Sequence, residues 1–245
     1  MKNCSYALDQ DDPATAPYGL IALQSDETIE SEFSRYFSDR LRPLYVSRVQ
    51  SSEDVTNETL AAMEQALPAA VSLLPSARTY SVVAYGCTSG SSVVGSDTVE
   101  RLVRQNCDTH DVTNPLRATI ACAADKSVSR FALLSPYIEE VNTSLRTAFA
   151  ESGLSTDVFG TFGVKEEAKV VRISAQSVID AAIKLGADPK VEAVFISCTN
   201  LRTIEVLAPI AKRIGKPVLS SNQALAWHMR HLAEYNGTKP QKLTG

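Results

Sequence analysis

Hydrophobic residues gather in short runs along the chain, and between these runs they recur at every third or fourth position. A short apolar run predicts a strand covered on both faces, whereas the wider spacing predicts an amphipathic helix. We predict strands at 18–23, 44–49, 80–85, 111–113, 130–134, 156–160, 191–196 and 216–219. Asp26 is the predicted N-cap of a helix that carries Ile29, Phe33 and Phe37 at helical spacing. Long helices are predicted at 56–74 (interrupted at Pro68), 91–105, 136–151 and 166–185, followed by one that comes after Asn200 and ends at Ile214, and a last one at 221–232.

Strands and helices therefore alternate through the chain, and the same order occurs twice. Alternation of this kind indicates parallel sheets with right-handed crossovers. We predict an α/β fold of two pseudo-symmetric Rossmann-like (flavodoxin-like) halves, each a short parallel sheet flanked by helices, with an active site in the cleft between them. The predicted organisation is a flexible leader at 1–17, a first half at 18–115 plus 220–245, and a second half at 116–219.

The third strands of the two halves can be laid over each other. Residues 82–89 then match residues 193–200, which pairs Cys87-Thr88 with Cys198-Thr199. Ligands of open α/β sheets bind beyond the carboxyl ends of the strands. A thiol that lies there, just before a helix N-terminus, tends to have a lowered pKa. We expect both thiols to be of this kind.

Two such thiols in one cleft suit acid–base chemistry on a small carboxylate. One thiolate would remove a proton next to the carboxylate, and the other thiol would deliver a proton to the opposite face. Taken singly, a cysteine at a strand end is more often a small buried residue, and only the repeat favours catalysis. Neighbouring hydroxyl and amide groups are the candidates to hold anionic oxygens: Thr88, Ser89, Thr199 and Asn200. The other cysteines (Cys4, Cys107 and Cys122) have no counterparts and are interpreted as structural or incidental.

Composition narrows the remaining classes of function. The 245 residues carry a net charge of −4, which argues against partners such as nucleic acid or an anionic membrane surface. Neither an apolar secretion signal nor a run of membrane-spanning length occurs, so we expect a cytoplasmic protein with reduced thiols. The glycine-rich segment after residue 86 lacks the lysine of a phosphate-binding loop, and GxGxxG is missing. We predict no cofactor and no metal.

From Gly19 to Leu232 the sequence resembles the aspartate/glutamate/hydantoin racemase superfamily, whose members work without cofactors and typically take one cysteine from each half. The maleate isomerase and arylmalonate decarboxylase branch is the most similar. The residues that carry the resemblance are 19–30, Cys87-Thr88-Ser89, Leu134-Ser135-Pro136-Tyr137 and 221–227. The resemblance implies that Tyr137 helps to bind the substrate carboxylate, and that the protein is a homodimer.

Departures from that branch refine the interpretation. Arylmalonate decarboxylases keep only the second cysteine, so the presence of both favours a racemase or isomerase. Maleate isomerases carry Asn at the position of Asp26, and an acidic Asp26 would repel a second carboxylate and suit an ammonium or hydroxyl group. Asp26, Phe162 and residues 166–168 are more similar to the ectoine-utilisation racemase-like proteins. This resemblance implies a racemase of an amino acid or hydroxylated derivative from ectoine or hydroxyectoine breakdown.

Three alternatives stay open at this point. The first is a maleate-type cis–trans isomerase with Cys87 as the nucleophile, and the second is a decarboxylase of the arylmalonate type. The third is a two-lobed protein that binds a small molecule without transforming it.

Overall fold

The first half of the chain forms a parallel α/β unit. A computed structural model describes residues 3–9, 12–39 and 41–238. After a short 3₁₀ turn at Pro13–Thr15, the elements are β1 (Tyr18–Leu23), α1 (Ile29–Tyr36), β2 (Leu44–Val49), α2 (Asn57–Ser72), β3 (Tyr80–Gly86), α3 (Thr88–Val94), α4 (Ser96–Asn106), β4 (Thr109–Thr113) and α5 (Pro115–Asp125). Every residue of β1 and β3 is buried, as expected for strands with helices on both faces.

The second half repeats this order. Its elements are β5 (Arg130–Ser135), α6 (Glu139–Glu151), β6 (Ser155–Thr161), α7 (Glu167–Val170), α8 (Ala175–Gly186), β7 (Ala193–Ile196), α9 (Leu207–Ile214), β8 (Val218–Ser220) and α10 (Ser221–Thr238). The two sheets have the strand orders β2-β1-β3-β4 and β6-β5-β7-β8, and all pairs are parallel. The predicted α/β fold with two similar parallel sheets is confirmed.

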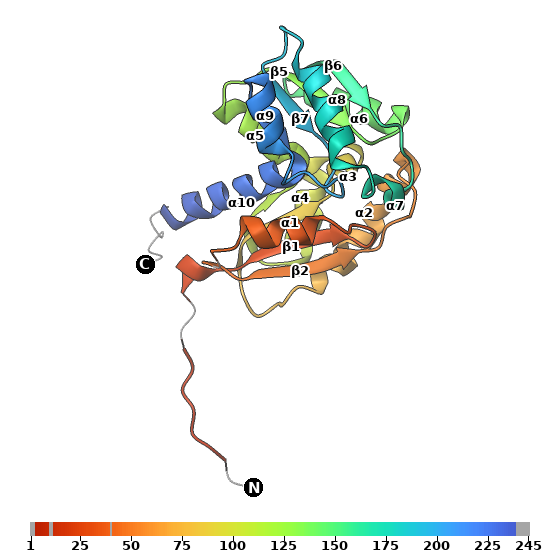
Figure 1. The fold of residues 1–245 in the computed structure, drawn as a ribbon. Helices are drawn as coiled ribbons and strands as arrows, with labels where there is room; N and C mark the ends of the chain where they lie inside the picture. The colour runs from red at the N-terminus through yellow and green to blue at the C-terminus, as the bar shows by residue number, and fades with distance from the viewer. Residues whose placement is uncertain (1–2, 10–11, 40, 239–245) are drawn as a thin grey trace.

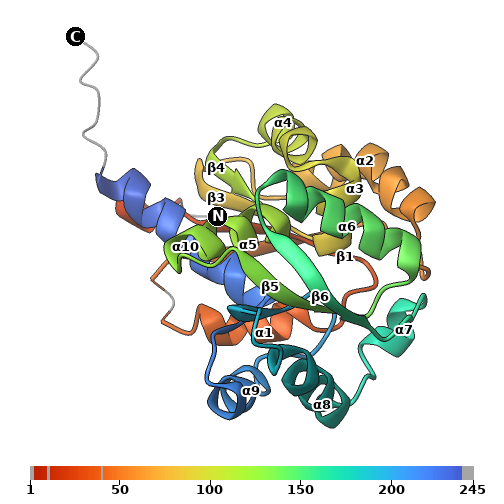
Figure 2. The same ribbon diagram turned by 90° about the horizontal axis from the view of Figure 1, so that it is seen from above.

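β3 and β7 occupy equivalent places in their sheets, so the segments that follow them leave equivalent edges. Figure 1 shows the second sheet above the first, with α10 extending beside them. α10 packs against β3, β4, α1 and α5 as well as β8, so the last helix joins the second sheet to the first. Seen from above, α3 and α6 lie together between the two sheets (Figure 2).

Several predicted helices are wrong in their extent. Gly95, at φ +89°, separates α3 from α4 where one helix was predicted at 91–105. The helix predicted at 166–185 is divided, because residues 165–167 pair with the loop after β2 and α8 begins only at the Ser174 cap. Conversely, α2 runs through Pro68 without interruption, since the buried Leu67 and Val71 hold it on the core on both sides of the proline.

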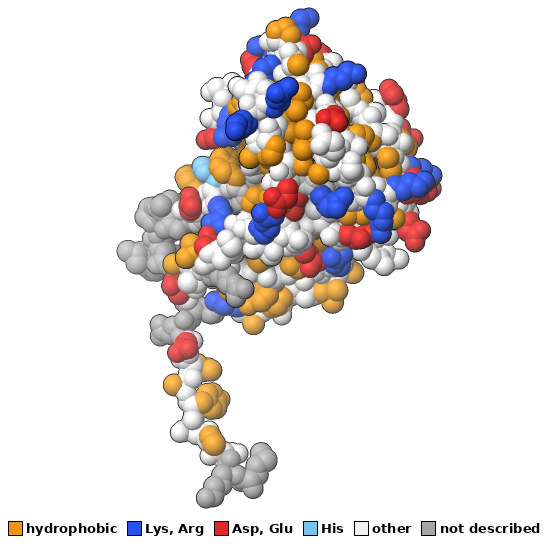
Figure 3. Space-filling view, in the orientation of Figure 1, with side chains coloured by type: hydrophobic (Ala, Val, Ile, Leu, Met, Phe, Trp, Pro, Cys, Tyr) orange, Lys and Arg blue, Asp and Glu red, His pale blue; other side chains and the backbone are white. Residues whose placement is uncertain are grey.

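Charged side chains of both signs are interspersed over the face shown in Figure 3, in keeping with the small net charge. None of the helices within the described part of the chain is both long and apolar enough to cross a membrane.

A buried carboxylate ties the two halves together. Glu32, on α1, is 3% exposed and accepts hydrogen bonds from the Thr203 and Ile204 backbone N–H groups at 2.6 and 2.9 Å. Its second oxygen accepts from Asn222 Nδ2 at 2.9 Å. Asn222 also donates to the carbonyl oxygen of Thr199 at 2.8 Å. Glu32 therefore holds the loop after β7 and the start of α10 against the first half.

Replacing this carboxylate tests how strongly the halves depend on it. We expect Glu32→Gln to lower the free energy of unfolding by roughly 2–3 kcal/mol, because charge-assisted bonds to buried donors are lost. Glu205→Gln is the control, since Glu205 is exposed and pairs with exposed Arg35, and it should change stability by less than about 1 kcal/mol. Urea unfolding measures both, and equal effects would contradict the assigned role of Glu32.

Candidate active site

Cys87 follows β3 directly and is the N-cap residue of α3. Its Sγ accepts a hydrogen bond from the Gly90 N–H at 3.2 Å and lies 3.7 Å from Ser89 Oγ. Position 90 must be glycine for this arrangement, because a Cβ there would lie 2.9 Å from the sulfur and 2.6 Å from the Tyr85 hydroxyl. The first turn of α3 therefore fixes the thiol in place.

The helix terminus does not make Cys87 acidic. The residue is 2% exposed, and its burial raises the pKa of the thiol to about 12. The Gly90 N–H and the Ser89 hydroxyl lower that pKa by less than burial raises it, and the charge of Glu167 raises it further. The prediction of a lowered pKa is wrong, because withdrawal from water outweighs the helix terminus.

Cys198 lies two residues beyond β7, in the loop that leads to α9. The sequence predicted that Cys198 lies just before a helix N-terminus. This prediction is wrong, because α9 begins only at Leu207. Its backbone has φ +103°, a conformation that side-chain-bearing residues seldom adopt. Burial raises the pKa of this thiol too, well above 9, and Glu167 adds to the rise. Both cysteines are therefore neutral thiols near pH 7.

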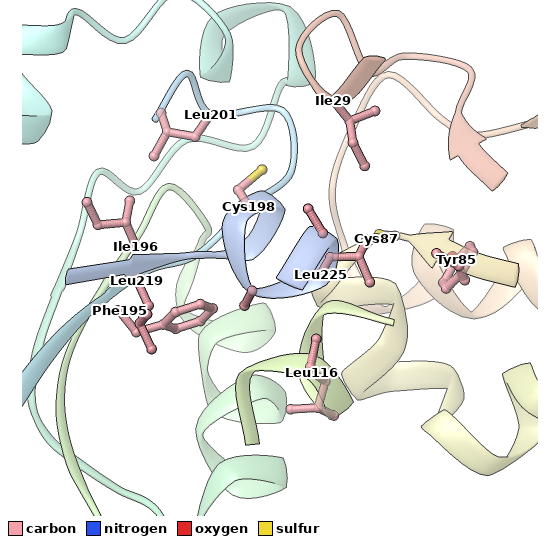
Figure 4. Packing of buried hydrophobic residues seen from close by; sticks show 14 of the residues in the cluster. Ile29, Tyr85, Cys87, Leu116, Phe195, Ile196, Cys198, Leu201, Leu219 and Leu225 are labelled. Carbon is pink, nitrogen blue, oxygen red and sulfur yellow. The ribbon is translucent and has the colours of Figure 1, made fainter. Parts of the chain in front are cut away.

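Hydrogen bonds at the start of α10 link the two cysteine loops. Ser221 Oγ accepts from Thr88 Oγ1 at 2.8 Å and from the Cys198 N–H at 3.0 Å. Thr199 Oγ1 donates to the carbonyl oxygen of Gly86 at 3.2 Å. Figure 4 shows the start of α10 between the loop of Cys198 and the end of β3 that carries Cys87. The two loops that match in sequence are thus also linked to each other in the structure.

Both thiols influence the pKa of the buried Tyr137. The phenol is 1% exposed, and burial raises its pKa well above 10. Negative charge on Cys198 or on Cys87 would raise that pKa further, so both cysteines act electrostatically on this hydroxyl group. Ser197 Oγ lies beside this phenol and is also buried. The hydroxyl groups of Tyr137 and Ser197 and the thiols of Cys87 and Cys198 thus belong to one site.

One carboxyl oxygen of Asp26 holds the start of a helix, whereas the other makes no hydrogen bond to the described residues. Its Oδ1 accepts from the Thr28 and Ile29 N–H groups, both at 2.8 Å, at the start of α1. The predicted capping role is therefore observed, although Thr28 is the residue in the cap position. The carboxyl group is 2% exposed, burial raises its pKa, and Oδ2 is enclosed. Asp26 acts electrostatically on both Cys198 and Glu167.

Glu167, at the start of α7, is a member of the site that the sequence did not reveal. It is 7% exposed, and burial raises its pKa to about 7, with the charge of Asp26 contributing. Asn200 Nδ2 donates to its Oε2 at 2.7 Å, while Asn200 Oδ1 accepts from the Glu27 N–H at 3.0 Å. Glu167 also borders a hollow of about 560 Å³ that extends outward along the loops after β1 and β2. The side chain of the adjacent Glu166 is 44% exposed. Residues 166–168 carried only a family resemblance, so nothing in the sequence separated the two acids.

The predicted polar residues lie around the thiols, but most of their groups hold the loops together. The Thr88 hydroxyl donates to Ser221, and the Thr199 hydroxyl donates to the carbonyl oxygen of Gly86. Asn200 donates from Nδ2 to Glu167 and accepts at Oδ1 from the Glu27 N–H. Ser89 remains beside Cys87. The structure therefore brings all predicted site residues together, and it makes the threonines and Asn200 positioning groups. Among the described residues no group of three or more His, Cys, Asp or Glu side chains could hold a metal ion.

Comparison with known proteins agrees with this arrangement. The family model described as arylmalonate decarboxylase matches residues 51–242, a range that includes both thiols, Tyr137 and Glu167. The chain belongs to the arylmalonate decarboxylase family. The predicted membership in the maleate isomerase and arylmalonate decarboxylase branch of the racemase superfamily is therefore confirmed.

A curated relative, arylmalonate decarboxylase from Bordetella bronchiseptica, is 29% identical over 123 residues. That match covers 50% of this chain and 48% of the relative, so it spans about half the length of that protein.

Solved structures share the fold. Maleate isomerase from Pseudomonas putida S16, determined with maleate, superposes with a TM-score of 0.77 at 17% identity, covering 87% of this chain and 90% of that one. A Nocardia farcinica maleate cis-trans isomerase variant with a covalently bound succinylcysteine intermediate has a TM-score of 0.77 at 20% identity (89% and 93% covered). A variant of arylmalonate decarboxylase in its liganded form has a TM-score of 0.78 at 22% identity, again with 89% and 93% covered.

The backbone of Cys198 offers a test of the strain in this site. Cys198→Gly should unfold with a free energy about 1 kcal/mol higher than Cys198→Ala, since glycine tolerates φ +103°. Cys122, inside α5, is the control, and there glycine should be less stable than alanine by about 1 kcal/mol. Thermal and urea unfolding of the four variants measure the difference. The same order at both positions would contradict strain at Cys198.

Proposed function

We propose that the chain is a cofactor-independent racemase or isomerase of a small carboxylate, with Cys87 and Cys198 as its acid–base pair. One observation carries the proposal: the buried thiols follow equivalent strands of two similar sheets, and Ser221 joins their loops by bonds to Thr88 and to the Cys198 N–H. Membership of the arylmalonate decarboxylase family supports it, because the relatives act on small carboxylates.

The reaction needs no oxidant or reductant. One cysteine, as thiolate, takes the proton from the carbon next to the carboxylate, and the electron pair of the C–H bond is delocalised into the carboxylate. The other thiol then gives its proton to the opposite face of that carbon. The product has the opposite configuration, and the two sulfurs have exchanged their protonation states. Each acid–base group contributes on the order of 10²–10⁴-fold, so that binding and charge stabilisation supply the remainder.

Hydroxyl groups beside the thiols are suited to the substrate carboxylate. The phenol of Tyr137 stays protonated, since burial raises its pKa, and is a hydrogen-bond donor at neutral pH. The buried Ser197 hydroxyl lies beside this phenol and adds a second donor at the same place. This agrees with the role that the family resemblance implies for Tyr137.

A racemase is preferred to the alternatives of the same family. A decarboxylase of the arylmalonate type would need only the second cysteine, whereas this chain holds thiols at both positions. A dicarboxylate such as maleate would meet two buried carboxyl groups, Asp26 and Glu167, beside the thiols. An amino acid or hydroxylated derivative, as in the resemblance to ectoine-utilisation proteins, fits better. The homodimer and the cytoplasmic location stay predictions.

Exchange with heavy water tests the mechanism. Small chiral 2-amino and 2-hydroxy carboxylates are incubated with the protein in deuterium oxide, and the product is analysed by NMR and chiral chromatography. We expect deuterium at the carbon next to the carboxylate in the racemised product, because the proton that is delivered comes from a solvent-exchanged thiol. Cys87→Ser and Cys198→Ser should each lower racemisation by at least about 10²-fold.

Cys107→Ser serves as the control, since Cys107 lies at the end of α4 away from the site and should leave the rate unchanged. Conversion of maleate without deuterium uptake would instead identify a cis–trans isomerase with Cys87 as the nucleophile. Full racemisation by either single serine variant, or no exchange with any substrate, would overturn the two-thiol mechanism.

A further inference from the structure

We propose that Asp26 and Glu167 together bind the ammonium group of the substrate, so that the site selects an amino acid over its hydroxyl, unsubstituted or dicarboxylate analogues. This rests on the proposed function and decides between the two substrate classes that it leaves open. Glu167 thereby becomes a residue that determines specificity.

The two carboxyl groups interact, because the charge of Asp26 raises the pKa of Glu167. They come from opposite halves, and the amide of Asn200 holds their segments together by bonds to the Glu27 N–H and to Glu167 Oε2. Asp26 Oδ2 is enclosed and makes no hydrogen bond to the described residues, although the Thr199 hydroxyl acts on this carboxyl group and lowers its pKa. An enclosed carboxylate oxygen without a donor is costly, and a ligand that supplies N–H donors and positive charge removes that cost.

Cationic side chains of the surroundings are engaged elsewhere. Arg48 donates to the carbonyl oxygen of Asp26 at 3.0 Å and pairs with Glu30, and its charge lowers the pKa of Asp26 by less than burial raises it. On the rim of the hollow, further ion pairs join Lys165 to Asp54, Lys169 to Glu166, and Arg172 to Glu27. The positive charge that would balance Asp26 and Glu167 is therefore assigned to the ligand.

An ammonium group here would also activate the thiols. Glu167 raises the pKa of both cysteines, and Asp26 raises that of Cys198. A cation within about 4–6 Å shifts a pKa toward the charged form by about 1–3 units. The ammonium group thus offsets the charge of Glu167 and Asp26 and lowers the pKa of both thiols, while burial, the larger cause, continues to raise it. Its carboxylate points to Tyr137 and Ser197, which leaves the carbon between them beside the thiols.

Matched ligands that differ only in the amino group provide the test. Binding of 2-aminobutyrate, 2-hydroxybutyrate and butyrate, and of aspartate and succinate, is measured by calorimetry on the full chain. We expect at least one amino acid to bind roughly 30-fold more tightly than its amino-free analogue, the effect of one buried charge pair. Glu167→Gln should remove that preference while keeping an oxygen for Asn200. Asp26→Asn, which retains the capping oxygen, should reduce it as well.

Glu166→Gln is the matched control, since Glu166 is the neighbouring, more exposed acid that pairs with Lys169, and it should keep the preference. Circular dichroism confirms that each variant is folded. Equal binding of the paired ligands, no binding of any amino acid, or a preference that survives in Glu167→Gln overturns the proposal. Exchange of 2-hydroxy acids but not amino acids would overturn it while leaving the two-thiol mechanism intact.

The pH dependence of binding gives a second readout. The titratable and charged groups around Glu167 are Asp26, Cys87, Cys198, Glu27, Glu53, Asp54, Lys165, Glu166, Lys169 and Arg172. The pKa of Glu167 is about 7, and only its ionised form attracts ammonium. Affinity for the amino acid should thus be full above pH 7 and fall as pH drops through 7. A Glu167→Gln variant with the same pH profile as the parent would contradict the assignment.

Discussion

Withdrawal of four ionisable side chains from water is the constraint on which this site depends. Two thiols and two carboxyl groups lie where the sheets meet, and burial raises the pKa of every one of them. A negative charge that is removed from water is energetically unfavourable, so in the free protein the thiols stay neutral. The chemistry therefore depends on what charge a ligand brings, which connects substrate choice to the activation of the sulfurs.

Polar groups around the cluster act mainly on the backbone. Ser221 bridges the two cysteine loops, Asn200 spans both halves, and Glu32 holds the loop after β7. The bonds of Ser221 to Thr88 and of Glu32 to Thr203 link segments more than a hundred residues apart. Together these bonds keep Cys198 in a backbone conformation that costs on the order of 1–3 kcal/mol. The rigidity of the thiols is thus provided by residues that do not react.

Prediction from sequence succeeded where the signal is local. All predicted strands are present, because an apolar run such as 18–23 has a single way to be buried between helices. Helix extents were less accurate, as the division at Gly95 and the late start of α9 show. These ends depend on a glycine conformation and on contacts of the loop after β7 with the other half, and neither follows from hydrophobic spacing.

The sequence by itself determined the repeated α/β order, the matched thiols, the capping aspartate and the motif that carries Tyr137. Only the tertiary structure decided that both thiols are neutral, that Glu167 joins them, and that the predicted threonines and Asn200 fasten loops. The physical reason is the same for each: a pKa and a hydrogen-bond partner depend on how far a group is removed from water and on what packs against it. At this site those neighbours come from both halves of the chain.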